Sequence, residues 1–200
     1  MQMRSFMFDM VRSELEDAVG RDNVSTSAAE RETYSVDYFW VGRMWQDKGA
    51  DGPMPDIIVR PGSSEEVSKV LKIANYYKIP VHTWGGGSGS QGGALPMAGG
   101  ILLDMKRMNH LISLDENAHS ITAEAGMIFQ QLEWYANEKG YSCMHIPSCL
   151  TCGTLCSLCF LIDSGGDWIE CVGQRFHLAQ IVQTGHCIVG AVNDLKLAAL

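Results

Sequence analysis

Apolar residues recur at helical spacing in three segments of the chain, the first of them at residues 10–19, and each segment predicts one amphipathic helix. Glycine follows the first and third segments as Gly20 and Gly140, where a glycine commonly ends a helix. Ser63 and Glu66 precede the second segment with the spacing of a capping box, and that helix should end near Tyr77. The apolar positions are Val11, Leu15 and Ala18, then Val67, Val70, Leu71 and Ala74, and finally Ile128, Leu132, Tyr135 and Ala136.

Short apolar or alternating runs between these helices predict β-strands. Residues 21–55 are instead polar and aromatic with several turn residues, so we expect a mostly irregular connection in which Trp40 and Trp45 are packing residues. The order of strand, helix, strand, loop, strands and helix is an α+β pattern. The expected strands are residues 56–59, 79–83, 101–104, 112–114 and 120–125.

Composition and charge narrow the range of partners. The chain has 200 residues, is 46% hydrophobic and carries a formal charge of −8 without a basic run. This charge argues against nucleic acid or an anionic membrane and favours a small-molecule partner. Residues 1–20 contain acids and no continuous apolar stretch, so we predict neither a signal peptide nor a transmembrane segment. A cytoplasmic location is therefore expected.

The most distinctive stretch is GGGSGSQGG, residues 85–93, directly after the strand predicted at 79–83. Glycine permits positive φ and lets a ligand approach main-chain N–H groups, so such a loop can bind a phosphate or diphosphate. A mobile surface loop of glycine and serine is the alternative. The G-x-G-x-x-G match from Gly87 to Gly92 opens no helix, as a Rossmann fingerprint would, and the chain contains no G-K-[ST] of a Walker loop. A ligand site in this stretch would therefore depend on the main chain.

The glycine run is part of a longer resemblance. Residues 56–155, with RPGSSEEVSKVLKIANYYKIPVHTWGGGSGSQGGALPMAGGILLDMKRMN, ITAEAGMIFQQLEWYANEKGY and HIPSCLTCGT, resemble the FAD-binding domain of the vanillyl-alcohol oxidase and para-cresol methylhydroxylase flavoproteins. The resemblance implies two small α/β subdomains with FAD between them. It divides the chain into a lead-in at 1–50, the FAD-binding domain at 51–155 and a divergent tail at 156–200. Family members continue into a substrate domain, which we expect to be absent because the chain stops at Leu200.

The resemblance also implies which residues contact FAD. In the family a first loop wraps the diphosphate, and a second loop lies against the cofactor on its other side. Some relatives bind FAD covalently through a histidine that follows two glycines of the first loop, and a few also use a cysteine of the second loop, near the position of Cys149. Ser88 stands at the histidine position, so non-covalent binding is expected. The residues implied are Gly85, Gly86, Gly87, Ser88, Gly89 and Ser90 in the first loop, and Pro147, Ser148, Thr151, Cys152, Gly153 and Thr154 in the second.

The cysteines suggest a competing chemistry. Cys149, Cys152, Cys156 and Cys159 have the spacing C-x2-C-x3-C-x2-C, which could ligate zinc or an iron–sulfur cluster. The long loop that usually separates two C-x2-C pairs is missing, so we expect reduced thiols and no metal. The scattered histidines are expected to be surface or hydrogen-bonded residues, and His145 alone stands beside a predicted cofactor loop. They are His82, His110, His119 and His145.

The family pattern is lost after Thr154, which leads to the hypothesis that residues 156–200 belong to a truncated or frame-shifted copy. Two functions remain open. The first is a flavin-dependent oxidoreductase, or its FAD-binding fragment, that takes a hydride from a small hydroxy acid such as D-lactate or glycolate. The resemblance also allows the phenolic-alcohol oxidase and ether-lipid synthase branches. The second is an FAD-binding module without catalysis that self-associates or needs a partner chain, since a missing domain would leave an apolar face exposed.

Overall fold

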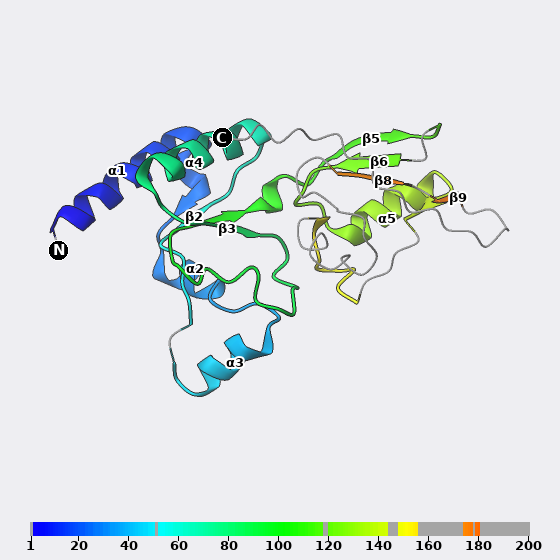
Figure 1. The fold of residues 1–200 in the computed structure, drawn as a ribbon. Coiled ribbons are helices and arrows are strands. Elements are labelled where there is room, and N and C mark those ends of the chain that lie inside the picture. Colours follow the sequence, from blue (N-terminus) through cyan, green and yellow to red (C-terminus); the bar gives the residue numbers. More distant parts are fainter. Residues whose placement is uncertain are drawn as a thin grey trace. The chain divides into compact units, whose positions relative to one another are not determined.

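The computed structural model describes residues 2–50, 52–117, 120–143, 148–155, 174–177 and 179–180 of the chain (Figure 1). They fall into two compact units, an N-terminal unit (Met1–Arg107) and a C-terminal unit (Met108–Leu200). In the described residues each unit has its own sheet, at least one helix and an apolar cluster, so the predicted α+β organisation in two small units is confirmed. The FAD-binding region predicted at 51–155 is divided between them.

A four-stranded sheet organises the N-terminal unit, with its strands in the order β1-β2-β4-β3. β1 runs antiparallel to β2, whereas β2, β4 and β3 are parallel to one another. β4 has a strand on each side and is buried along its whole length, which suits its three apolar residues, Ile101 to Leu103. The strands are β1 (Val24–Ser25), β2 (Ile57–Val59), β3 (Val81–Trp84) and β4 (Ile101–Asp104).

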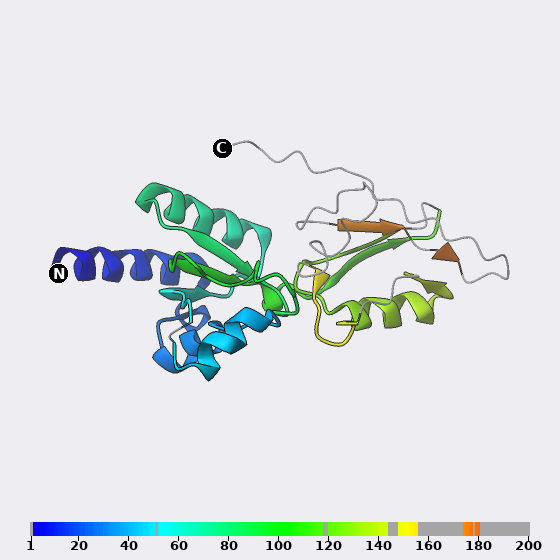
Figure 2. The same cartoon turned by 60° about the horizontal axis from the view of Figure 1, so that its bottom comes forward.

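Two of the helices of this unit, α1 and α4, lie beside each other (Figures 1 and 2). α4 begins at the predicted capping box: Ser63 Oγ accepts a hydrogen bond from the Glu66 N–H at 3.3 Å, and the Glu66 carboxylate accepts one from the Gly62 N–H at 2.7 Å. The helices are α1 (Gln2–Val19), α2 (Ala28–Thr33), α3 (Trp40–Asp47) and α4 (Ser64–Tyr77), with 3₁₀ turns η1 (Arg21–Asn23) and η2 (Met105–Arg107).

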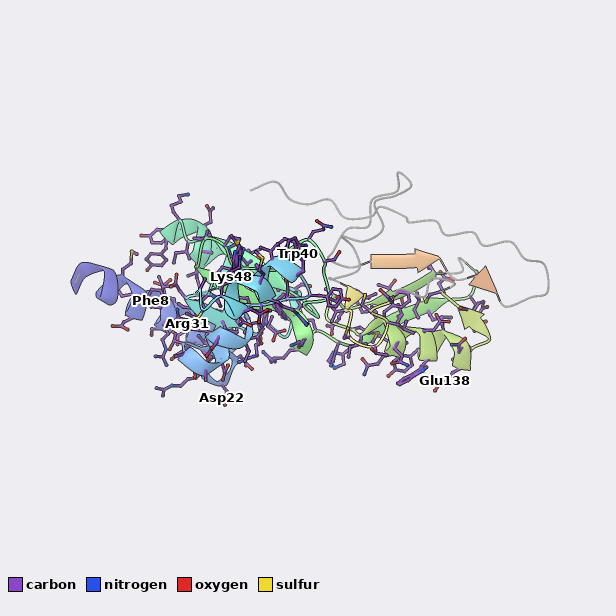
Figure 3. The ribbon with its side chains drawn as sticks, turned by 90° about the horizontal axis from the view of Figure 1, so that it is seen from below. Phe8, Asp22, Arg31, Trp40, Lys48 and Glu138 are labelled. Carbon is purple, nitrogen blue, oxygen red and sulfur yellow. The ribbon has the colours of Figure 1, made fainter. Side chains whose placement is uncertain are left out.

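Several predictions for this unit were wrong in detail. Residues 21–55 contain η1, β1, α2 and α3 and are not mostly irregular; on α3, Val41, Met44 and Trp45 stand at helical spacing. Trp40 begins α3 and is 65% exposed, so it is not a packing residue (Figure 3). On α4, Val70 and Ala74 are buried but Leu71 is 42% exposed. Each residue turns about 100° around a helix, which places Leu71 outside a narrow buried face.

In the part of the C-terminal unit that is described, a sheet packs against a ten-residue helix. β5 (Leu111–Asp115), β6 (Ser120–Ala123) and β8 (Gln174–His177) form an antiparallel sheet in that order, and β7 (Tyr141–Ser142) pairs with β9 (Ala179–Gln180). α5 (Phe129–Glu138) lies along one face of this sheet (Figure 2). Its predicted face is partly wrong, because Ile128 is the N-cap and Tyr135 is exposed. The buried cluster consists of Ile121, Ala123, Met127, Phe129, Leu132, Ala136, Tyr141, Cys143 and Leu155.

Candidate functional site

The glycine-rich loop (residues 85–93) follows β3, at the carboxyl end of the parallel part of the sheet. Gly87 and Gly92 have φ of +63° and +75°, a region that other residues rarely adopt. A Cβ added to Gly87 would lie 2.6 Å from Cζ2 of Trp84, and one added to Gly92 would lie 2.8 Å from Cδ1 of Phe39. The glycines at these two positions are therefore required by conformation and by space.

Main-chain donors of this loop are available to a ligand. Within the described residues, the N–H groups of Gly87, Ser88 and Gly89 donate to no acceptor. The Gly87 carbonyl, in contrast, accepts a hydrogen bond from the Tyr38 N–H at 2.9 Å. One side of the loop is thus tied to the fold while its successive donors stay unused, which is how a main-chain anion site is built.

Buried polar atoms without a partner gather around the same loop. In the described part of the chain they are Asp37 Oδ2, His82 Nε2 and Ser88 Oγ. His82 lies in β3 just before the loop, Ser88 lies in the loop, and Asp37 precedes the residue that bonds Gly87. Burial lowers the pKa of His82 and raises the pKa of Asp37, because it disfavours the charged form of each side chain. His82 therefore departs from the expectation of a surface or hydrogen-bonded histidine.

A network missed by the sequence analysis supports the loop from within the N-terminal unit. The Tyr34 ring meets Trp84 edge-on with centroids 5.0 Å apart, and the Tyr34 hydroxyl donates to Asp104 Oδ2 at 2.6 Å. Burial first, and then the bond to Asp104, raise the pKa of Tyr34 to about 12. Trp84, which contacts Gly87, is thereby held in place. The one available signal was the position of Trp84 between a strand and the glycine run.

The second predicted loop is a turn in the C-terminal unit that closes the start of α5. The carbonyls of Leu150 and Gly153 accept hydrogen bonds from the N–H groups of Gln130 at 3.1 Å and Phe129 at 3.0 Å. These carbonyls occupy the first donors of the helix, so the α5 N-terminus is not a free anion site. Thr154 forms a β-bridge with Ile128.

The residues predicted for the second loop differ in exposure. Ser148, Thr151 and Cys152 are exposed, whereas Gly153 and Thr154 are buried, and Pro147 lies outside the described residues. The structure thus gathers five of these six residues in one turn of the C-terminal unit. The six residues of the first loop, Gly85 to Ser90, lie together in the N-terminal unit.

Cysteines and the other histidines give no second site in the part of the chain that is described. Cys143, Cys149 and Cys152 are free thiols there, and no three metal-ligating side chains gather among these residues. Cys156 and Cys159 of the predicted pattern lie outside the described residues, as do His119 and His145. His110 is an exposed residue whose Nδ1 lies 2.8 Å from Glu124 Oε2.

Comparison with known proteins decides the family. The model of the FAD binding domain family matches residues 55–160, just over half of the chain. The chain belongs to this family. Its cofactor is FAD, and the described site fits that cofactor, because the first loop holds unused main-chain donors, two glycines that no larger residue could replace and the unpaired Ser88 hydroxyl. No helix in the described residues combines the length and apolar character needed to cross a membrane.

Curated relatives include two that act on small hydroxy acids by name. A probable mitochondrial D-lactate dehydrogenase of Danio rerio is 29% identical over 132 residues, which are 66% of this chain and 25% of the relative. Glycolate oxidase subunit GlcD of Bacillus subtilis is 28% identical over 145 residues, 72% of this chain and 29% of the relative. The chain therefore spans between a quarter and three tenths of the length of these relatives.

Solved structures share the fold. An alkyldihydroxyacetonephosphate synthase matches with a TM-score of 0.70 and 25% identity, over 76% of this chain and 28% of that protein. A 4-ethylphenol oxidase from Gulosibacter chungangensis matches with a TM-score of 0.63 and 26% identity, over 84% of this chain and 30% of that one. A p-cresol methylhydroxylase matches with a TM-score of 0.55 and 25% identity, over 67% and 25% of the two chains.

Proposed function

We propose that this chain is the FAD-binding part of a flavin-dependent oxidoreductase that acts on a small 2-hydroxy acid such as D-lactate or glycolate. The observation that carries the proposal is the glycine loop with its unused main-chain donors, inside a chain that belongs to an FAD-binding family. The choice of substrate class rests on the named relatives, a D-lactate dehydrogenase and a glycolate oxidase subunit. When bound, FAD supplies the group that accepts a hydride.

The first loop would bind the diphosphate of FAD. Main-chain N–H groups from Gly87 to Gly89 donate to anionic oxygens, and the Ser88 hydroxyl adds a donor that lacks a partner among the described residues. Because the Gly87 carbonyl is bonded to the Tyr38 N–H, the loop is anchored through an acceptor and keeps these donors for the ligand. The other proposed contacts of this loop are Gly85, Gly86 and Ser90.

The second loop would contribute side-chain donors. Ser148 and Thr151 are exposed hydroxyls on a turn that is fixed to the start of α5, so they can meet a ligand without unfolding. Pro147, Cys152, Gly153 and Thr154 complete the proposed set. Binding would be non-covalent, because Ser88 offers no imidazole to the flavin ring. A thioether to Cys149 would instead keep the flavin with the acid precipitate.

A phenolic-alcohol oxidase or ether-lipid synthase is a second candidate, favoured by the structural match to an alkyldihydroxyacetonephosphate synthase and a 4-ethylphenol oxidase. A binding module without catalysis, which self-associates or needs a partner chain, is a third. We further propose a cytoplasmic location. A small-molecule substrate is common to the first two candidates.

Absorption spectroscopy tests the proposal. The purified chain is recorded with FAD, then precipitated with acid, and flavin bands that shift on binding and pass into the supernatant support non-covalent FAD binding. D-lactate, glycolate or 4-ethylphenol is then added without oxygen. The substrate that reduces and so bleaches the flavin identifies the candidate function. A chain that binds FAD but is bleached by none supports the binding module, and a chain that binds no FAD overturns the proposal.

A further inference from the structure

Asp37 is a buried carboxyl group in the connection that leads into α3. Only 5% of the residue is exposed. Its Oδ1 accepts a hydrogen bond from the Phe39 N–H at 2.8 Å, which closes a tight turn over Tyr38 just before the helix begins. Its Oδ2 is buried as well and has no partner among the described residues.

The two residues that follow Asp37 reach both ends of the glycine-rich loop. The Tyr38 N–H donates to the Gly87 carbonyl at 2.9 Å. The Phe39 ring fills the space beside Gly92, where an added Cβ would come within 2.8 Å. Gly87 and Gly92 are the two positions of this loop with positive φ. The turn set by Asp37 therefore contacts the loop at the two residues that determine its path.

We propose that Asp37 is a positioning residue for the glycine-rich loop, acting through Tyr38 and Phe39 to hold the main-chain donors between Gly87 and Gly92 in a binding arrangement. It does not touch the ligand, because both of its oxygens are enclosed or bonded. The inference rests on the proposed function in one respect, namely that the ligand of this loop is FAD.

Stability alone does not explain a carboxyl group at this position. A buried oxygen without a partner destabilises a fold, and an ionised one does so more strongly. The useful feature of Asp37 is the acceptor Oδ1 at the right place to close the turn. Asparagine has the same acceptor on a side chain of the same shape, whereas alanine has none. The two substitutions therefore separate the acceptor from the charge.

The test compares Asp37→Ala, Asp37→Asn and the control Asp47→Ala, which removes an exposed carboxylate at the other end of α3. FAD and ADP dissociation constants are measured by titration, and the apoprotein melting temperature is measured beside them. We expect Asp37→Ala to weaken FAD and ADP alike by about five- to tenfold, the effect of losing one capping-type hydrogen bond. Asp37→Asn should keep both dissociation constants within about twofold of wild type, and those of the control should equal wild type.

The outcomes separate this inference from the proposed function. If wild type and Asp37→Ala bind FAD equally well, the inference alone is overturned. The same holds if Asp37→Asn binds FAD as weakly as Asp37→Ala. Wild type that binds no FAD overturns the proposed function together with the inference. Should Asp37→Ala not fold, Asp37→Ser replaces it, because a hydroxyl closes such turns more weakly. An FAD dissociation constant of Asp37→Ser between the wild-type value and the value expected for alanine then supports the inference. A dissociation constant equal to that of wild type contradicts it.

Discussion

Trp84 and Gly87 are in such close contact that a single methyl group between them could not be accommodated, since an added Cβ would lie 2.6 Å from Cζ2 of the indole. Gly87 also has a φ of +63°. We expect Gly87→Ala to weaken FAD binding at least about fivefold, because strain of about 1–3 kcal/mol is relieved only if the loop moves. Fluorescence titration with FAD measures the loss.

Gly93→Ala is the matched control for this change. Gly93 belongs to the same loop, but an added Cβ there has no atom within 4 Å and its φ is not in the left-handed region. Its FAD dissociation constant should stay within about twofold of wild type. Equal losses for Gly87→Ala and Gly93→Ala would show that the loop has no preferred shape and would contradict the requirement for glycine at position 87.

The Tyr34 hydroxyl bonds Asp104 and so fixes the Tyr34 ring that packs against Trp84; removal of the hydroxyl should weaken the N-terminal unit. Tyr34→Phe deprives the buried Asp104 carboxyl of its donor at 2.6 Å, and we expect a loss of about 1–3 kcal/mol in the free energy of unfolding. Urea denaturation of the apoprotein measures this loss. Tyr38→Phe is the control, because the Tyr38 side chain is 65% exposed and its main-chain bond to Gly87 is unchanged.

The sequence predicts those elements of the fold whose signals lie in adjacent residues, and it misses features that depend on packing between distant segments. β4 and α4 were predicted because an apolar run and a capping box are local features, read from adjacent residues. α3 was missed because polar, aromatic and turn residues dominate residues 21–55, although Val41, Met44 and Trp45 stand at helical spacing within it. The exposure of Leu71 and Tyr135 depends on what packs against each helix, which periodicity alone does not determine.

The candidate site also combines features that local sequence predicts with features that depend on distant contacts. The composition of the glycine run predicted a main-chain ligand loop, and the resemblance assigned FAD to it. Asp37 and Tyr34 could not be found in that way, because the loop that they support lies about fifty positions further along the chain. Buried polar groups of this kind are recognised only once the fold brings the distant segments together.

The carboxyl group of Asp37 should give the fold a pH dependence. Burial raises its folded-state pKa above the usual value of 3.8, so the folded state favours the protonated form. Its contribution to stability is therefore fully present below pH of about 4 and is lost as pH rises through the folded pKa. Asp37→Asn should thus raise the melting temperature of the apoprotein at pH 7 more than at pH 4. Asp47→Asn, at an exposed position, should show no such difference. A wild-type melting temperature above that of Asp37→Asn at pH 7 would contradict the prediction.

Cys152 reports on the second loop, because it is exposed on the proposed contact surface while Cys143 is buried. Burial raises the pKa of the Cys143 thiol, and the neighbouring Glu133 carboxylate raises it further, so Cys143 should react slowly with iodoacetamide. Mass spectrometry of the apoprotein at pH 8 should find Cys152 alkylated well before Cys143. Saturating FAD should then slow alkylation of Cys152 by at least about fivefold if the second loop meets the cofactor, whereas unchanged alkylation with FAD bound would remove Cys152 from the proposed site.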